Sequence, residues 1–260
     1  MSKTALVTGA SGGIGLEFAE RLVKNGYQVT LVARGEGKLK EHVARLGAGH
    51  RYLAADLSKP EDTKRVADDL RATKYDVLVN NAGVGVYGLF DQSSLESIRS
   101  MMRLNIDSLV DLSHAYLSTA KSGDSLINVA STLALLAFPG ASVYAASKAF
   151  VTAFSEGLWF ENKGRNVYVG ALLPGVTRTN FHEAAGGAAG GRPPDAISQN
   201  ADAVIDVGMQ MLADRSKPTV LTSFTNKAMV FFSTRLMPRK TMVSMMGGSS
   251  PAKPHPQLKS

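Results

Sequence analysis

The chain has 260 residues and a formal net charge of +7, with 44% hydrophobic and 20% charged residues and no cysteine. The missing cysteine excludes disulfides, thiolate metal sites and cysteine catalysis. The composition is that of a globular protein, and the length favours a single large domain. The first residues lack the apolar core of a signal peptide, and no run of about 20 apolar residues occurs. We therefore expect a cytoplasmic protein without a membrane-spanning helix.

The positive charge is concentrated toward the carboxyl end. Eight of the 29 basic residues follow Asp214, and no acidic residue does, so residues 1–214 carry 21 basic and 22 acidic side chains. A nucleic-acid-binding protein usually spreads its excess of basic residues over one face of its core. This distribution does not predict nucleic-acid binding.

Short apolar runs alternate with longer amphipathic ones through most of the chain. The predicted strands are 5–8, 28–33, 51–55, 77–80, 125–130 and 167–173. The predicted helices are 14–24, 39–46, 60–73, 95–117 and 142–161. After a loop rich in glycine and alanine at 184–194, a helix at 201–214 and a strand at 219–222 complete the series. Such alternation predicts a doubly wound α/β fold, Rossmann-type, with a parallel sheet covered on both faces.

A glycine-rich turn joins the first strand to the first helix. Thr8 to Gly15 read TGASGGIG, which spaces Gly9, Gly13 and Gly15 as G-x3-G-x-G. Glycine permits a tight turn and close approach of a ligand, and the amino end of a helix attracts phosphate. Glycine clusters also make ordinary loops, but this position predicts a dinucleotide site. The predicted contacts are Gly9, Ser11, Gly12, Gly13, Ile14 and Gly15.

The end of the second strand indicates which dinucleotide is bound. An acid there would bind the ribose 2′-hydroxyl of NAD, but the sequence is Val32-Ala33-Arg34. A guanidinium can pair with a 2′-phosphate, so Arg34 predicts NADP(H). The alternative is a solvated surface arginine.

Further motifs follow in a fixed order. They are Asp56-Leu57, NNAG at 80–83, Asn105, Ser131, the Y-x3-K pair Tyr144 and Lys148, Pro174-Gly175 and Thr179. Together with the glycine-rich turn, they resemble the short, single-domain branch of the short-chain dehydrogenase/reductase family over residues 4–180. The resemblance implies an oxidoreductase that interconverts a carbonyl and a secondary alcohol by hydride transfer.

Tyr144 and Lys148 are the predicted centre of catalysis. They lie four residues apart and therefore on one face of the predicted helix. A nearby ammonium would lower the pKa of the Tyr144 phenol, which would exchange a proton with the substrate oxygen. Ser131, at the end of the fifth strand, would hydrogen-bond the same oxygen. The resemblance implies that Lys148 also holds the nicotinamide ribose and that Asn105 supports a water chain. Taken singly, each residue could be an ordinary surface or strand-end residue.

The resemblance assigns the remaining motif residues to the cofactor. Asp56 and Leu57 would contact the adenine, and Asn81, Ala82 and Gly83 would let the backbone pass close to the adenosine ribose. Pro174, Gly175 and Val176 would turn beneath the nicotinamide, and Thr179 would bond its carboxamide. The five histidines are scattered, so no metal site is predicted.

Two apolar segments, 84–90 and 132–140, indicate a lipophilic ketone or a 3-oxoacyl-type substrate, unless they serve only as core. We expect residues 1–222 to form the dinucleotide-binding and catalytic domain. Residues 223–248 would be a C-terminal lid or interface segment of the same domain, and 249–260 a flexible tail.

Residues 224–246 contain five of the ten methionines and only basic charges. This segment could cover the substrate pocket, contact another subunit or lie on an anionic membrane. The first two interpretations are favoured. The resemblance also implies a homodimer or homotetramer through helices 95–117 and 142–161, where Phe150, Phe154 and Trp159 would suit an interface. A non-catalytic NADP-binding sensor or scaffold and a protein whose main role is membrane recruitment are the functional alternatives.

Overall fold

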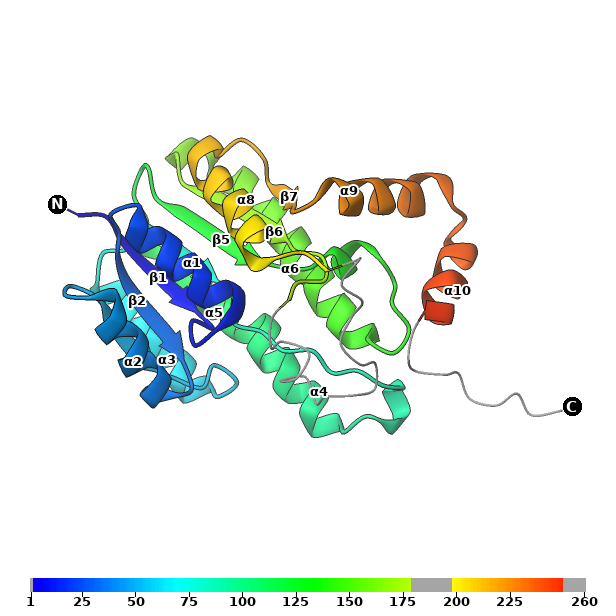
Figure 1. Cartoon of the computed structure of the whole chain (residues 1–260), viewed down its shortest axis with the longest axis horizontal. Coiled ribbons are helices and arrows are strands. Elements are labelled where there is room, and N and C mark those ends of the chain that lie inside the picture. Colours follow the sequence, from blue (N-terminus) through cyan, green and yellow to red (C-terminus); the bar gives the residue numbers. More distant parts are fainter. Residues whose placement is uncertain (1, 179–197, 250–260) are drawn as a thin grey trace, which may run out of the picture.

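The computed structural model describes residues 2–178 and 198–249 and contains one parallel sheet in the order β3-β2-β1-β4-β5-β6-β7 (Figure 1). Its strands are β1 (Thr4–Thr8), β2 (Gln28–Ala33), β3 (Arg51–Ala54), β4 (Val77–Asn80), β5 (Ser125–Val129), β6 (Tyr168–Leu173) and β7 (Thr219–Leu221). The order reverses between β1 and β4, as in a doubly wound sheet. The predicted Rossmann-type fold is confirmed.

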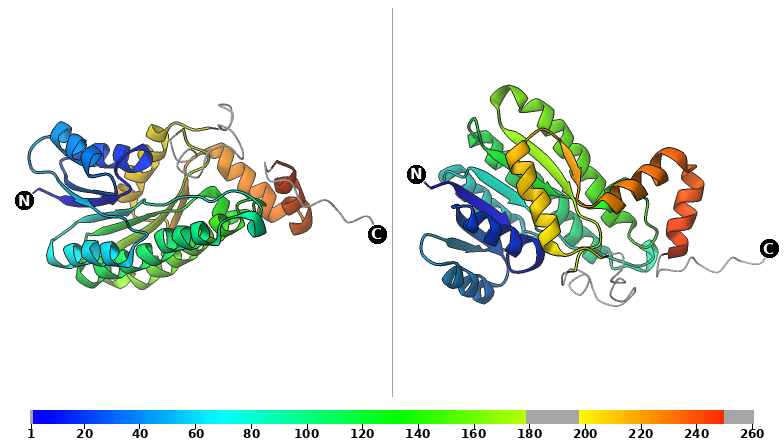
Figure 2. Two further views of the ribbon diagram at one scale, coloured as in Figure 1. Left: turned by 90° about the horizontal axis from the view of Figure 1, so that it is seen from below. Right: turned by 45° about the horizontal axis from the view of Figure 1, so that its top comes forward.

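Helices cover both faces of the sheet (Figure 2). One face carries α1 (Gly13–Lys24), α2 (Glu36–Leu46) and α8 (Ala201–Asp214). The other carries α3 (Pro60–Ala72), α4 (Leu95–Met102), α5 (Ser108–Thr119) and α6 (Ser142–Glu161). The strands are buried on both sides because alternate residues point to opposite faces. In β1, Ala5 and Val7 pack under α1, whereas Leu6 packs in the cluster of α3 and α5.

The predicted single helix over 95–117 is interrupted in the structure. A π-helical turn at Arg103–Asp107 separates α4 from α5. Such a turn adds a residue to the helical repeat and re-aims the side chains within it. It buries Asn105, whose amide bonds to the backbone of Val84. The sequence pattern does not show this interruption because helical residues flank it on both sides.

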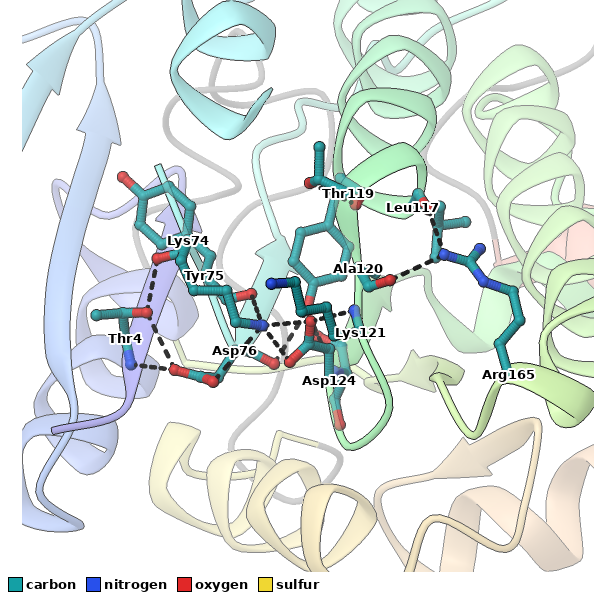
Figure 3. A network of polar contacts seen from close by, with 12 residues as sticks. Thr4, Lys74, Tyr75, Asp76, Leu117, Thr119, Ala120, Lys121, Asp124 and Arg165 are labelled. Carbon is teal, nitrogen blue, oxygen red and sulfur yellow. Dashed lines mark hydrogen bonds and ion pairs between the residues drawn. The ribbon is translucent and has the colours of Figure 1, made fainter. Parts of the chain in front are cut away.

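A polar network ties together the amino ends of β1, β4 and β5 (Figure 3). The Thr4 backbone N–H donates to the Asp76 carboxylate at 2.7 Å, and Lys74 forms ion pairs with both Asp76 and Asp124. Asp124 has a side chain only 4% exposed and also accepts from the Lys121 N–H at 2.7 Å. This network fixes one end of the central strands, and the motif residues lie at the other end.

The chain beyond β7 forms an arm, defined here as residues 224–249, that contains α9 (Phe224–Phe231), a π-helical turn (Phe232–Leu236) and α10 (Arg239–Ser249). The chain bends between the two helices (Figure 1), and Pro238, which cannot continue a helix, lies between them in the sequence. Val230 and Met242 of the arm are buried with Leu136. None of the helices within the described ranges has the length and hydropathy needed to span a bilayer. The predicted loop at 184–194 and the tail from 250 lie outside the described residues.

Candidate active site

The carboxyl ends of the central strands bring the predicted motifs to one edge of the sheet. The glycine-rich turn follows β1, Asn81 to Gly83 follow β4, Ser131 follows β5 and Pro174 follows β6. In open α/β sheets, ligands bind at this edge, where the strand order reverses. The predicted site residues that the structure describes are therefore grouped where a dinucleotide and its substrate would meet.

The glycine-rich turn has the geometry of an anion cradle. Gly9 and Gly13 have φ of 67° and 55°, in the left-handed region that favours glycine. A Cβ on Gly15 would collide with the Gly9 carbonyl oxygen, whereas a Cβ on Gly12 would meet nothing within 4 Å. Helix α1 begins at Gly13 and has no acid in its first turn. The cradle therefore fits a pyrophosphate at a helix amino end, beside Ser11 and Ile14.

Thr8 and Asn81 fix this turn to the neighbouring strand. The Thr8 hydroxyl oxygen accepts from the backbone N–H groups of Asn81 and Ala82, both at 2.9 Å. The Asn81 side-chain amide donates to the Thr8 carbonyl, also at 2.9 Å. The resemblance places Asn81 at the cofactor, but Thr8 is not among the predicted site residues. A hydroxyl at the last position of the first strand was the available signal.

Arg34 and Asp56 lie together at the predicted adenosine end. Arg34 is exposed immediately after β2. Burial tends to raise the pKa of the Asp56 carboxyl, but hydrogen bonds from Ser58 and the charge of Arg34 hold it below its usual range. Leu57 is buried beside them. The pair places an acceptor and a guanidinium at one rim of the cradle.

Ser131, Tyr144 and Lys148 form the core of the candidate catalytic group. Tyr144 and Lys148 are buried on α6, and the Lys148 Nζ lies 6.0 Å from the centroid of the Tyr144 ring. The Lys148 Nζ donates to the Val129 carbonyl at 2.9 Å. Ser131 makes a side-chain hydrogen bond with Tyr144, and its Oγ also accepts from the Leu133 N–H at 3.2 Å. Strand β5 and helix α6 thus place three motif residues in one group.

Asn105 reaches the same group from the π-helical turn. Its Oδ1 accepts from the Val84 N–H at 3.0 Å, and its Nδ2 donates to the Val84 carbonyl at 2.9 Å and to the Ser147 Oγ at 3.2 Å. A Cβ on Gly83 would lie 3.2 Å from the Asn105 Oδ1 and 3.3 Å from the Lys148 Nζ. Gly83 is therefore the place where the β4 loop, the π turn and α6 meet. Ser147 was missed because a lone serine inside a helix carries no sequence signal.

The electrostatics of Tyr144 differ from the sequence-based expectation. Burial raises the pKa of the Tyr144 phenol, Tyr87 adds to this, and the hydrogen bond with Ser131 acts in the opposite direction. Burial also lowers the pKa of the Lys148 amine to about 8. The expected lowering of the Tyr144 pKa by Lys148 is not seen, because the amine bonds to the Val129 carbonyl and burial of the phenol dominates. In this arrangement Tyr144 is a protonated acid at neutral pH.

The turn after β6 contacts both the candidate catalytic loop and the arm. The Pro174 carbonyl accepts from the Thr132 N–H at 2.9 Å, and the Val176 carbonyl accepts from the Gln199 N–H at 2.9 Å. The amide of Asn226 in α9 occupies the space that a Cβ on Gly175 would need. Asn226 was not predicted, since the contact joins segments about 50 residues apart whose approach depends on tertiary packing. Thr179 lies outside the described residues.

Apolar side chains surround Tyr144. Its ring and that of Tyr87 have centroids 6.0 Å apart, and burial raises the pKa of Tyr87 to about 12. The cluster around Tyr144 contains Met101 and Ala141, with Val84, Val86, Tyr87, Leu133, Phe138 and Val143 packed against it. The segments 84–90 and 132–140 thus both pack with Tyr144 and border the candidate site. Within residues 2–178 and 198–249, no group of three or more histidines or acids could hold a metal ion.

Comparisons with known proteins agree with this geometry. The model of the short chain dehydrogenase family matches residues 3–188. Serine 3-dehydrogenase of Rhizobium radiobacter is 34% identical over 70% of this chain and 74% of its own length. Very-long-chain 3-oxoacyl-CoA reductase of Rattus norvegicus is 30% identical over 70% of this chain and 61% of its own length.

A solved structure shows the same fold. A short-chain dehydrogenase from Sphingobium yanoikuyae in complex with NADPH matches with a TM-score of 0.78 and 32% identity, over 85% of this chain and 88% of that one. The family match covers most of the chain, and the sheet order and the grouping of the motif residues agree with it. The chain therefore belongs to the short-chain dehydrogenase/reductase family of oxidoreductases.

Proposed function

We propose that the chain is an NADPH-dependent reductase that converts a lipophilic ketone or a 3-oxoacyl-type compound into a secondary alcohol. The observation that carries this proposal is the hydrogen bond between the half-buried Ser131 and Tyr144, which is buried near Lys148 within an apolar cluster. A protonated phenol in such a place suits proton donation to a carbonyl oxygen. The similarity to a 3-oxoacyl-CoA reductase supports the same direction and substrate class.

The residues at the sheet edge fit a dinucleotide. Bound there, NADPH would supply a hydride to the carbonyl carbon. The cradle from Gly9 to Gly15 would hold the pyrophosphate, Arg34 the 2′-phosphate, and Asp56 and Leu57 the adenine. Asn81, Ala82, Gly83, Pro174, Gly175, Val176 and Thr179 would complete the site. The NADPH complex of the Sphingobium yanoikuyae protein supports the choice of NADP(H).

The chain's own residues would handle the oxygen. The Tyr144 Oη would donate its proton to the substrate oxygen, and the Ser131 Oγ would hydrogen-bond the same oxygen as negative charge develops on it. Lys148 would orient the nicotinamide ribose, the role that the resemblance to the family assigns to it. Asn105, fixed by Val84 and Ser147, would support a water chain that returns a proton to the site.

The surroundings of Tyr144 favour a lipophilic substrate over a small charged one. Serine 3-dehydrogenase, by its name, acts on a zwitterion, and a buried ammonium and carboxylate would need charged partners. Apart from Ser131 and Lys148, the neighbours of Tyr144 named above are apolar or aromatic. Burial of an acyl or ring substituent against them would stabilise the complex by about 0.8 kcal/mol per methylene group.

Oxidation of NADPH and of NADH should be measured against a panel of cyclic ketones, 3-oxoacyl thioesters and short aldehydes, with serine as an alcohol in the reverse direction. We expect turnover with NADPH and a long or cyclic ketone, and its loss in Tyr144→Phe with NADPH binding retained. In Arg34→Ala, the preference for NADPH over NADH should fall at least about tenfold. Turnover only with serine, or a preference of the wild-type enzyme for NADH, would contradict the corresponding part of the proposal.

A non-catalytic NADP-binding sensor or scaffold is the alternative. It would bind NADPH with no turnover on any member of the panel, and Tyr144→Phe would leave its behaviour unchanged. The grouping of the half-buried Ser131 with the buried Asn105, Tyr144 and Lys148 argues against it, because a binding module has no chemical use for all four.

The outer side of α6 supports a proposed homo-oligomer. Phe150 is exposed and stacks on Phe154, with ring centroids 5.6 Å apart. Sedimentation velocity would detect a homodimer or homotetramer, and Phe150→Asp should shift it toward a monomer.

A further inference from the structure

The outer side of the arm exposes several large apolar side chains. Phe224 is 83% exposed, Phe231 55%, Phe232 57% and Leu236 65%. Positions 224 and 231 share one side of the helix, about a third of a turn from the buried Val230, and position 232 lies nearly opposite Val230. These four side chains, with the neighbouring Lys227 and Arg235, are called the arm surface below. A patch of this kind marks an interaction site on most folded proteins.

The charges around these apolar side chains have one sign. Lys227, Arg235, Arg239 and Lys240 are exposed on the arm, and the chain contains no acidic residue after Asp214. None of these four cations forms an ion pair in the part of the chain that the structure describes. Apolar side chains bordered only by cations complement a layer whose interior is hydrocarbon and whose outer groups are anionic.

A shallow cavity adjoins the arm surface and shares Lys227, Phe231 and Arg235 with it. It has a volume of about 360 Å³ and lies where α9 and the following π turn meet the body of the protein. Its lining consists of Leu135, Leu221, Val230, Phe231 and Thr234 together with Lys227 and Arg235. An apolar lining with two cations suits an amphiphile whose anionic group lies next to hydrocarbon, which is the chemistry of an acidic phospholipid.

We propose that the arm surface docks on an anionic lipid bilayer, with Phe224, Phe231, Phe232 and Leu236 entering the interface and the cations contacting acidic headgroups. The arm lies at the opposite end of the molecule from α2 (Figure 1), so docking leaves the predicted adenosine end free. A second copy of the chain is a poor occupant, because two-fold pairing of the arm surface would bring the cations of both copies into one interface, and the arm offers no carboxylate to pair with them. The proposal is independent of the substrate proposed above.

Flotation of the full chain with vesicles tests it directly. Vesicles of phosphatidylcholine alone are compared with vesicles of equal parts phosphatidylcholine and phosphatidylglycerol. We expect binding only to the second kind, and its loss at high salt. Phe231→Ser/Phe232→Ser should lower the partition coefficient at least about tenfold. Lys227→Gln/Arg235→Gln should lower it roughly 25-fold, about fivefold per cation.

Two variants serve as matched controls. Phe160→Ser removes a phenylalanine that is 70% exposed at the end of α6, and Lys24→Gln removes an exposed lysine at the end of α1. Both should float like the wild-type chain. Thermal unfolding and NADPH binding verify that every variant is folded. If the phenylalanine variants misfold, flotation of the Lys227→Gln/Arg235→Gln variant still tests the proposal.

Three results would overturn the proposal. The first is equal flotation with neutral and anionic vesicles, and the second is equal loss in the arm and control variants. The third is a change in sedimentation coefficient without vesicles in Phe231→Ser/Phe232→Ser, because the arm surface would then be an interface between copies of this chain.

Discussion

Lys148 provides the sharpest test of the electrostatics of the site, through the substitution Lys148→Met. Methionine has a similar length and no charge. Burial lowers the pKa of this amine from 10.5 to about 8. Burial of the ammonium therefore destabilises the folded state by about 3 kcal/mol at neutral pH. The substitution also removes the hydrogen bond to the Val129 carbonyl, which costs about 1–3 kcal/mol. We therefore expect the variant to be as stable as the wild type or up to about 2 kcal/mol more stable, but inactive.

The pH dependence of stability separates these two contributions. The folded-state pKa of Lys148 lies below its unfolded value, so the folded protein releases this proton first as the pH rises. Between about pH 8 and the ordinary pKa of lysine, the unfolded chain binds more protons, and the free energy of unfolding of the wild type rises with pH. The variant lacks this increase. The wild type should gain about 2 kcal/mol relative to the variant between about pH 7.5 and pH 9.5.

Urea unfolding, followed by the fluorescence of Trp159, the only tryptophan, measures the free energy at both pH values. Lys24→Met, which removes an exposed lysine, is the control and should track the wild type at both pH values. A constant difference between the wild type and Lys148→Met over this range would show that the Lys148 pKa is not lowered. The explanation from burial would then be refuted.

Three further substitutions test other parts of the structure. Gly15→Ala should weaken NADPH binding at least about tenfold, because its Cβ would meet the Gly9 carbonyl. Gly37→Ala in α2 is the control: its Cβ would face open space, so NADPH binding should be unchanged. Equilibrium fluorescence titration measures the affinity of both variants. Asn105→Ala should lower the free energy of unfolding by about 2 kcal/mol, because it leaves half-buried Val84 backbone groups without these partners; an unchanged urea midpoint would contradict this. Asp124→Asn should lower the free energy of unfolding by about 2 kcal/mol, because the buried Asp124 carboxylate pairs with Lys74 and accepts from the Lys121 N–H (Figure 3). Asp68→Asn is the control, because its partner Lys64 is exposed. It should change the free energy of unfolding by less than about 0.5 kcal/mol in the same assay.

The sequence predicted the sheet well because its strands are continuous apolar runs bounded by polar residues. The ranges 28–33 and 77–80 agree with β2 and β4, and helices 142–161 and 201–214 agree with α6 and α8. The motif positions were predictable for a related reason, since ligand-binding residues follow strand ends in this fold.

What the sequence could not predict depends on contacts across the fold. The π turn that buries Asn105 exists because Val84 and Ser147 satisfy its amide, and those partners come from other segments. The packing of Asn226 against Gly175 likewise joins the arm to the turn after β6. The raised pKa of Tyr144 follows from how deeply α6 is buried, which spacing along a helix does not reveal.

The two buried charged side chains among the described residues differ in whether a charged partner stabilises them. Asp124 and Lys148 are each about 4% exposed. Asp124 forms an ion pair with Lys74, and its oxygens bind the network at the amino ends of the strands. Lys148 has no carboxylate partner in the described part of the chain and bonds only to a neutral carbonyl there. An unpaired buried charge destabilises a fold, and such a charge is retained most readily where it serves a reaction. The burial of Lys148 without a carboxylate partner therefore indicates a role in the reaction, and this indication does not depend on the Y-x3-K motif.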